Sequence, residues 1–195
     1  MNRFEVYNLA LNILNIEPLE EGTDISRSSD DPVVKTLNGF YGTALRKASR
    51  EHDWSFLMER IVLADDMGPE AGYSHSYRLP DNLFRLCHAE GGDYRRFGDT
   101  LATNGDPVIY CITMDTSSKG DVIFGNDSLI PDDFWELVAY QLAIHASVRL
   151  TAGDAKTQTI ATLYNSLRST LVMNDIHHES KIVEHTCEVL EGYGL

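Results

Sequence analysis

Apolar residues recur every three or four positions in the first part of the chain, and this spacing predicts two amphipathic helices. The first apolar stripe begins at Phe4 and ends before Pro18. The second helix has a clear start, because Asp31 is a capping residue and Pro32 suits a first helical turn. It ends near Trp54, with basic residues in its later turns where they complement the helix dipole.

The residue pattern changes between residues 59 and 128, where short β-favouring runs alternate with clusters of turn residues. Gly, Pro, Asn and Asp fill those clusters, and runs of this length between such turns are typical of antiparallel strands. The sequence therefore predicts a small antiparallel β module, with strands near 60–63, 76–79, 83–87, 107–114 and 121–124.

The helical pattern returns at Pro131. Residues 134–150 are apolar on nearly every face, which predicts a helix buried by several neighbours. A fourth helix starts near Asp154 and ends near Asn174. The last twenty residues place scattered apolar side chains among charges, so that segment is either frayed or a docking arm.

These elements predict an α+β fold with an antiparallel helical-bundle core, an inserted small antiparallel β module and an extended C-terminal arm. Residues 1–58 and 129–175 form the helical core domain in this interpretation. Residues 59–128 form the inserted β module, and 176–195 form the arm. With 195 residues, the chain is long enough to bury a core without a disulfide or metal.

The charge balance narrows the function classes. Thirty acidic residues oppose sixteen basic ones, giving a net charge of −14, which disfavours tight binding of nucleic acid. The same charge serves simple solubility, or lets DNA pass without adhering. The N-terminus predicts an amphipathic helix rather than a signal peptide, and no stretch has the length and apolarity of a membrane span. Three widely spaced cysteines indicate free thiols in a reducing compartment.

Candidate chemistry is sparse, and the sequence predicts neither a metal site nor a cofactor. Glu51 and Asp53 beside Trp54 form a conceivable glycosidase pair, although a solvated helix end with a core tryptophan explains them as well. A basic cluster in the β module is either an ordinary solvated face or a set of partners for acidic groups of a neighbouring subunit. Its members are Arg78, Arg85, Arg95 and Arg96.

The order of several short motifs is more informative than any one of them. Asp53-Trp54-Ser55-Phe56 ends the second helix, and Leu79-Pro80-Asp81-Asn82 follows a predicted strand. Gly98-Asp99-Thr100-Leu101 comes next, and Ile130-Pro131 precedes the main helix. In this order and spacing, over about residues 1–175, the chain resembles the tail tubular protein A family, the head-to-tail adaptors of short-tailed bacteriophages.

The resemblance implies a non-enzymatic structural protein of the virion tail, assembled in the host cytoplasm. Such adaptors form a homo-oligomeric ring, usually of twelve copies, that joins the portal protein to the tail nozzle. The ring also meets tail fibres and extends the channel through which DNA passes without specific binding. No membrane anchor or cofactor is implied. Two alternatives are a tail-associated polysaccharide or peptidoglycan hydrolase and an acidic cytoplasmic regulator that binds a partner protein.

Two hypotheses assign residues to these contacts. The arginines of the β module provide subunit or nozzle contacts. The apolar residues of the C-terminal segment bind the portal, because they have no obvious place in the core. That set consists of Ile182, Val183, Val189, Leu190, Tyr193 and Leu195.

Overall fold

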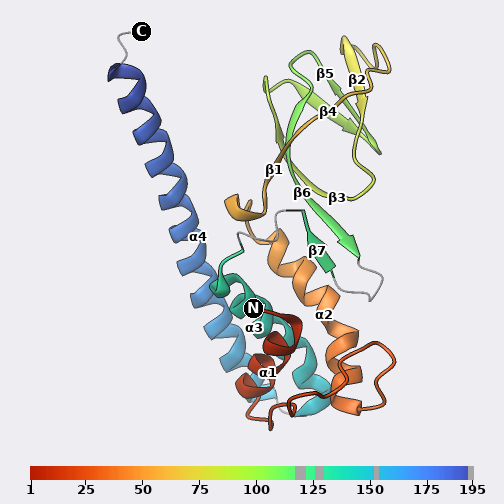
Figure 1. Ribbon diagram of the computed structural model, residues 1–195, viewed down its shortest axis with the longest axis vertical. Helices are drawn as coiled ribbons and strands as arrows, with labels where there is room; N and C mark the ends of the chain where they lie inside the picture. The colour runs from red at the N-terminus through yellow and green to blue at the C-terminus, as the bar shows by residue number, and fades with distance from the viewer. Residues whose placement is uncertain (117–121, 126–129, 152–153, 193–195) are drawn as a thin grey trace. The chain divides into compact units, whose positions relative to one another are not determined.

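A computed structural model describes residues 1–116, 122–125, 130–151 and 154–192 (Figure 1). For Thr116, Ile123, 154–155 and 177–192 it describes the backbone only. The chain divides into two compact units. Unit 1 contains Met1–Ser55 and Pro131–Leu195, and unit 2 contains Phe56–Ile130.

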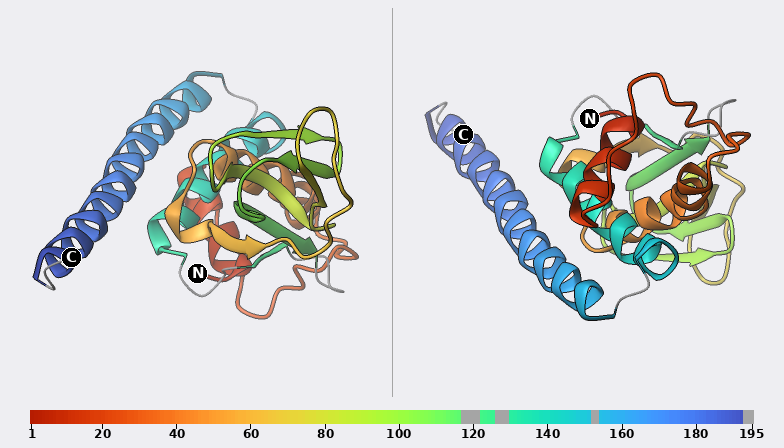
Figure 2. Two further views of the ribbon diagram at one scale, coloured as in Figure 1. Left: turned by 90° about the horizontal axis from the view of Figure 1, so that it is seen from above. Right: turned by 90° about the horizontal axis from the view of Figure 1, so that it is seen from below.

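Unit 1 consists of helices, and α3 contacts each of the other three. Figure 2 shows α1 and α3 side by side. Nearly every turn of α3 carries a fully buried side chain, Phe134 and Leu142 among them, so the predicted burial of this helix is confirmed. The helices are α1 (Arg3–Ile13), α2 (Pro32–Arg50), α3 (Asp132–Leu150) and α4 (Asp154–Gly192).

Local capping signals place the starts of the first two helices. Asn2 and Glu5 form a reciprocal capping box at the start of α1. At the start of α2, the Asp31 carboxylate accepts hydrogen bonds from the backbone N–H groups of Val33 and Val34, at 2.7 and 3.1 Å. The cap that the sequence predicts at Asp31-Pro32 is therefore confirmed.

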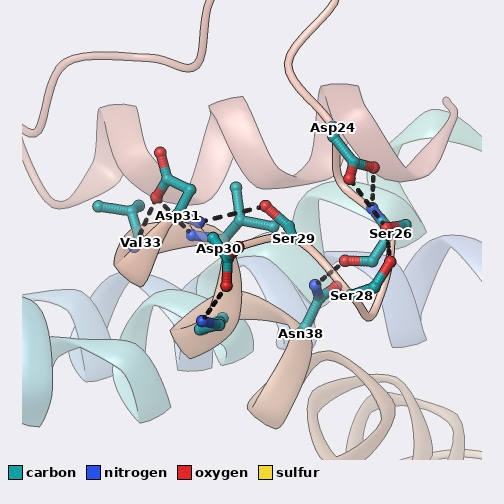
Figure 3. A network of polar contacts seen from close by, with 10 residues as sticks. Asp24, Ser26, Ser28, Ser29, Asp30, Asp31, Val33 and Asn38 are labelled. Carbon is teal, nitrogen blue, oxygen red and sulfur yellow. Dashed lines mark hydrogen bonds and ion pairs between the residues drawn. The ribbon is translucent and has the colours of Figure 1, made fainter.

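The loop between α1 and α2 is held by side-chain hydrogen bonds (Figure 3). Asp24 accepts from the backbone N–H and the hydroxyl of Ser26. The Asn38 amide donates to the Ser26 carbonyl at 2.9 Å, and its oxygen accepts from the Tyr7 hydroxyl at 2.7 Å. Residues of α1, α2 and the loop thus share one polar network, which Arg3 completes by bonding Tyr7 and Asn38.

Unit 2 contains two antiparallel sheets. One has the strand order β1-β6-β3, with β7 pairing with the far part of β6, and the other has the order β2-β5-β4. A core cluster that includes Tyr77, Leu101 and Ile109 takes residues from both sheets. The strands are β1 (Glu59–Val62), β2 (His75–Arg78), β3 (Leu83–Ala89), β4 (Tyr94–Phe97), β5 (Thr100–Thr103), β6 (Val108–Thr116) and β7 (Val122–Phe124).

The predicted fold class, a helical-bundle core with a small β insertion and an extended C-terminal arm, is wrong. The described chain is mixed α/β, about 45% helix and 22% strand, with four helices and two antiparallel sheets. The two sheets bury an apolar cluster of their own, so unit 2 has its own hydrophobic core. In the segment read as an extended arm, α4 continues to Gly192.

The reason that α4 passes Asn174-Asp175 is tertiary. Asn and Asp usually favour helix ends because their side chains compete for nearby backbone groups. Here the Asp175 carboxylate instead accepts hydrogen bonds from the backbone N–H and the hydroxyl of Ser55, 120 residues away. Since its oxygens are engaged across unit 1, they do not compete with the backbone of α4.

Candidate interaction surfaces

The arginines predicted as one interface do not form a single cluster. Arg78 lies on β2 and Arg95 and Arg96 on β4, the two outer strands of one sheet, whereas Arg85 lies on β3 in the other sheet. Arg78 and Phe97 both pair with Thr100 of the central strand, β5. Alternation along β4 puts Arg95 on the same face as that row and Arg96 on the opposite face.

The face that carries Arg78 and Arg95 is cationic and aromatic. The Arg95 guanidinium lies 5.2 Å from the centre of the Phe97 ring, in cation–π contact. Arg78 forms an ion pair with Asp81 at 3.3 Å, and both side chains are exposed, so water screens the pair. Arg78 and Arg95 thus present exposed positive charge on one face of this sheet.

A second cationic surface lies on the C-terminal half of α2. Arg46, Lys47 and Arg50 are exposed and, with Thr43 and Glu51, line an open depression of about 400 Å³. We call these five residues the basic surface. In the sequence these three basic residues are explained by the helix dipole alone. Their spacing of three and four residues, which places them on one helix face, was a signal for this surface.

Glu51 does not neutralise the basic surface, because its carboxylate already has partners from α4. Arg168 Nε lies 2.8 Å from one carboxylate oxygen of Glu51, and the Tyr164 hydroxyl donates to the other at 3.2 Å. Burial, together with the Glu51 charge, raises the pKa of Tyr164, which keeps that phenol protonated as a donor. Arg46 and Lys47 form no ion pair with another described residue.

The neighbouring residues of α3 extend this surface with an aromatic contact. The rings of Phe40 and His145 stack at 5.9 Å, and the Arg149 guanidinium lies 5.2 Å from the Phe40 ring centre. Burial, and to a lesser extent the positive charge of Lys47, lowers the pKa of His145. At neutral pH this imidazole is therefore uncharged, and the positive charge of the surface comes from lysine and arginine alone.

Ser55, His52 and Asp175 superficially resemble a hydrolytic triad, but their connectivity is different. His52 Nε2 lies 3.1 Å from the Asp175 carboxylate, and the Ser55 hydroxyl donates to that same carboxylate. In a catalytic triad the imidazole stands between the serine and the acid and removes the serine proton. This group therefore joins the end of α2 to the middle of α4.

The glycosidase interpretation of Glu51, Asp53 and Trp54 finds no geometric support. Trp54 is fully buried, and its indole N–H donates to the Ala48 carbonyl at 3.0 Å, so its ring presents no face to a sugar. Trp54 packs edge-on against Phe134, 5.9 Å between ring centres. The structure thus agrees with the alternative that the tryptophan belongs to the core.

The residues predicted to bind the portal fall where side chains are not described. Ile182, Val183, Val189 and Leu190 belong to α4, of which only the backbone is described there. Tyr193 and Leu195 lie outside the described residues. Their assignment stays a prediction.

The described residues contain neither a metal-binding cluster nor a membrane-spanning helix. Among them, no group of three or more His, Cys, Asp or Glu side chains gathers as a metal site would require. No helix in the described ranges combines the length and apolarity needed to cross a bilayer. In unit 2, burial raises the pKa of the Cys111 thiol to about 11, so this cysteine stays protonated and unreactive.

Comparison with known proteins leaves the family open. No protein-family model matches the chain, and no curated protein matches it.

Proposed function

We propose that this chain is a structural subunit of a phage head-to-tail adaptor, a ring that joins the portal to the tail nozzle around the DNA channel. The main support is the position in the structure of the four motifs that resemble the adaptor family. Trp54 and Phe56 flank the point where the chain leaves unit 1, and Ile130 and Pro131 flank the point where it returns. The other two motifs follow β2 and form the turn between β4 and β5.

This placement gives three of the four motifs a physical role. The buried ring of Trp54 anchors the end of α2 just before the chain enters unit 2. Pro131 directly precedes α3, and Asp132 and Asp133 put negative charge at the positive end of that helix. Gly98, with φ of 61°, supplies the left-handed residue of the turn between β4 and β5.

An adaptor subunit acts through its surfaces, and two cationic faces among the described residues support this proposal. The faces around Arg95 and Arg46 carry exposed positive charge on a strongly acidic chain. Identical acidic copies repel one another at long range, so a stable assembly needs local regions of opposite sign. In this proposal those faces provide contacts with sister subunits or with the nozzle.

The direct test mixes the purified full-length chain with portal rings encoded by the same genome and examines the product by electron microscopy. The expected result is an added collar of subunits beneath the portal. Portal rings that stay bare at saturating protein would contradict the proposal. A zymogram on cell-wall polysaccharide, with a known hydrolase as positive control, separates this function from the hydrolase alternative.

A truncation after Ile176 tests the predicted portal-binding segment. It keeps Asp175 and its contacts with Ser55 and His52, so unit 1 retains its described packing. The truncated chain should fold, as checked by circular dichroism, yet lose attachment to portal rings. Full attachment of the truncated chain would reject the assignment of portal contacts to 177–195.

A further inference from the structure

The loop that precedes α2 carries an excess of negative charge. Six acidic residues and one basic residue, Arg27, lie between positions 17 and 31. Asp24, Asp30 and Asp31 are engaged by Ser26, Lys35 and the start of α2. Glu17, Glu20 and Glu21 are exposed and form no ion pair with another described residue.

We call residues 17–23 the acidic turn. It has a defined shape, because the backbone N–H and the hydroxyl of Thr23 both donate to the Glu20 carbonyl, and Gly22 adopts φ of 87°. The Asn8 amide pairs with the backbone N–H and carbonyl of Leu19, which fixes the turn to α1. A carboxylate pair on an ordered turn loses little entropy when it meets a partner.

The basic surface lies near the other end of the same helix. From Pro32 to Arg50, α2 rises 1.5 Å per residue, so its two ends are roughly 28 Å apart. Figure 1 shows the loop at the N-terminal end of α2, away from the end that carries Arg46 and Lys47. Neither of those two side chains forms an ion pair with a described residue. Among the described residues, unit 1 thus has charge of opposite sign, not neutralised by ion pairs, toward the two ends of α2.

We infer that the acidic turn of one copy docks on the basic surface of a second copy, with Glu20 and Glu21 meeting Arg46 and Lys47. The partner is a second copy of this chain because the chain itself supplies the complementary charge. A contact between different surfaces of identical subunits is head-to-tail and propagates to a ring or a filament. The inference deepens the proposed function, since it assigns the contact between neighbouring subunits.

The opposing candidate for the basic surface is the phosphate backbone of DNA. The overall charge of −14 argues against it, because long-range repulsion opposes the approach of a polyanion. The acidic turn of one copy is also repelled by the net charge of a second copy. The second copy, however, offers a basic surface that attracts this turn at short range. The observations therefore favour a sister chain over nucleic acid.

Charge reversal tests the pairing in the full-length protein, by sedimentation velocity at low salt. R46E/K47E and E20K/E21K should each weaken self-association by roughly tenfold or more, because like charges then face each other. The quadruple variant carrying both reversals should regain self-association close to the wild type. Added salt at about 0.5 M should weaken the wild-type contact, since screening is then strong.

D65K/E70K is the matched control, because it changes the net charge as much as E20K/E21K but lies in unit 2. It should leave self-association unchanged, and circular dichroism should show every variant folded. The inference is overturned if the wild type is monomeric throughout, if the two reversals have no effect, or if the quadruple variant fails to recover. It is also overturned if R46E/K47E abolishes binding of a short DNA duplex while self-association persists.

The outcome is separable from that of the proposed function. Suppose that the quadruple variant recovers self-association but portal rings stay bare. That result would support the contact and reject the adaptor role. A collar on portal rings whose formation ignores both reversals would support the adaptor role and reject the contact.

Discussion

The two units differ in how they connect distant parts of the chain. Unit 1 joins two stretches separated by all of unit 2, chiefly by packing α3 against α1 and α2. The buried Trp54 ring and long-range polar contacts such as Asp175 to Ser55 add to this packing. Unit 2 is continuous, and its strands pair antiparallel around one apolar cluster. We therefore expect single buried groups to contribute more to the free energy of unfolding in unit 1. In unit 2 many strand-pairing hydrogen bonds share that contribution.

Replacing Trp54 should have the largest effect. Trp54→Ala removes a fully buried ring that packs against Phe134, and it should lower the free energy of unfolding by about 3–5 kcal/mol. Chemical denaturation followed by circular dichroism measures this loss. Trp54→Phe, which keeps an aromatic ring and loses the hydrogen bond to Ala48, should cost clearly less. Equal losses would show that ring volume is not what stabilises this region.

Asp175 comes next, because its substitution severs the polar link between the end of α2 and α4. Asp175→Ala leaves the Ser55 N–H and His52 without their shared acceptor, which should cost about 2–3 kcal/mol. The matched control is Asp132→Ala, which removes an exposed ion pair with the N-terminal amine and should cost at most about 1 kcal/mol. Similar midpoints in urea for the two variants would contradict the importance of the buried link.

Replacing a glycine in unit 2 adds an atom instead of removing atoms from unit 1. A Cβ at Gly125 would collide with the Glu59 carboxylate and the Thr113 hydroxyl, which bond each other, so Gly125→Ala should destabilise unit 2 by about 1–3 kcal/mol. Gly39→Ala in α2 meets open space and should stabilise unit 1 by up to about 1 kcal/mol. Thermal unfolding that shifts both variants in one direction would refute this reading.

The smallest effect concerns the pH dependence of unit 1. Because the pKa of His145 is lowered by burial, the unfolded chain takes up a proton near pH 6.5 while the folded chain does so only at lower pH. Stability is therefore intact above that range and declines as the pH falls below about 6.5. His145→Gln should flatten this decline in urea titrations at several pH values. An unchanged slope would assign the decline to other groups.

Several elements were predictable because their signals are local. A cap and a proline at Asp31-Pro32 act within one helical turn, and the continuous apolarity of α3 requires burial whatever its neighbours are. The turns of unit 2 were also predictable, because glycine and proline restrict or free the backbone locally. In contrast, neither β4 nor β5 was among the predicted strands. The Tyr94-Arg95-Arg96-Phe97 pattern lacks apolar alternation, and both strands depend on pairing with each other.

The candidate surfaces were only partly predictable. The sequence indicates which residues are cationic, but Arg95 and Arg96 point to opposite faces only because residues 94–97 form a strand against β5. The positive excess around Arg46 arises because α4 supplies Arg168 to engage Glu51. The contact between Glu51 and Arg168 joins residues more than a hundred positions apart, which no local pattern encodes.

Amino-acid order alone thus determined where α1 and α2 begin, that α3 is buried, and that the middle of the chain forms strands, since these follow from spacing and capping over a few residues. Only the tertiary structure decided that α4 runs on past Asp175 and that Trp54 is enclosed. It also decided that charges of opposite sign, without ion-pair partners among the described residues, lie toward the two ends of α2. The physical reason is that burial and charge neutralisation are properties of the groups brought together by folding, not of the residues taken one by one.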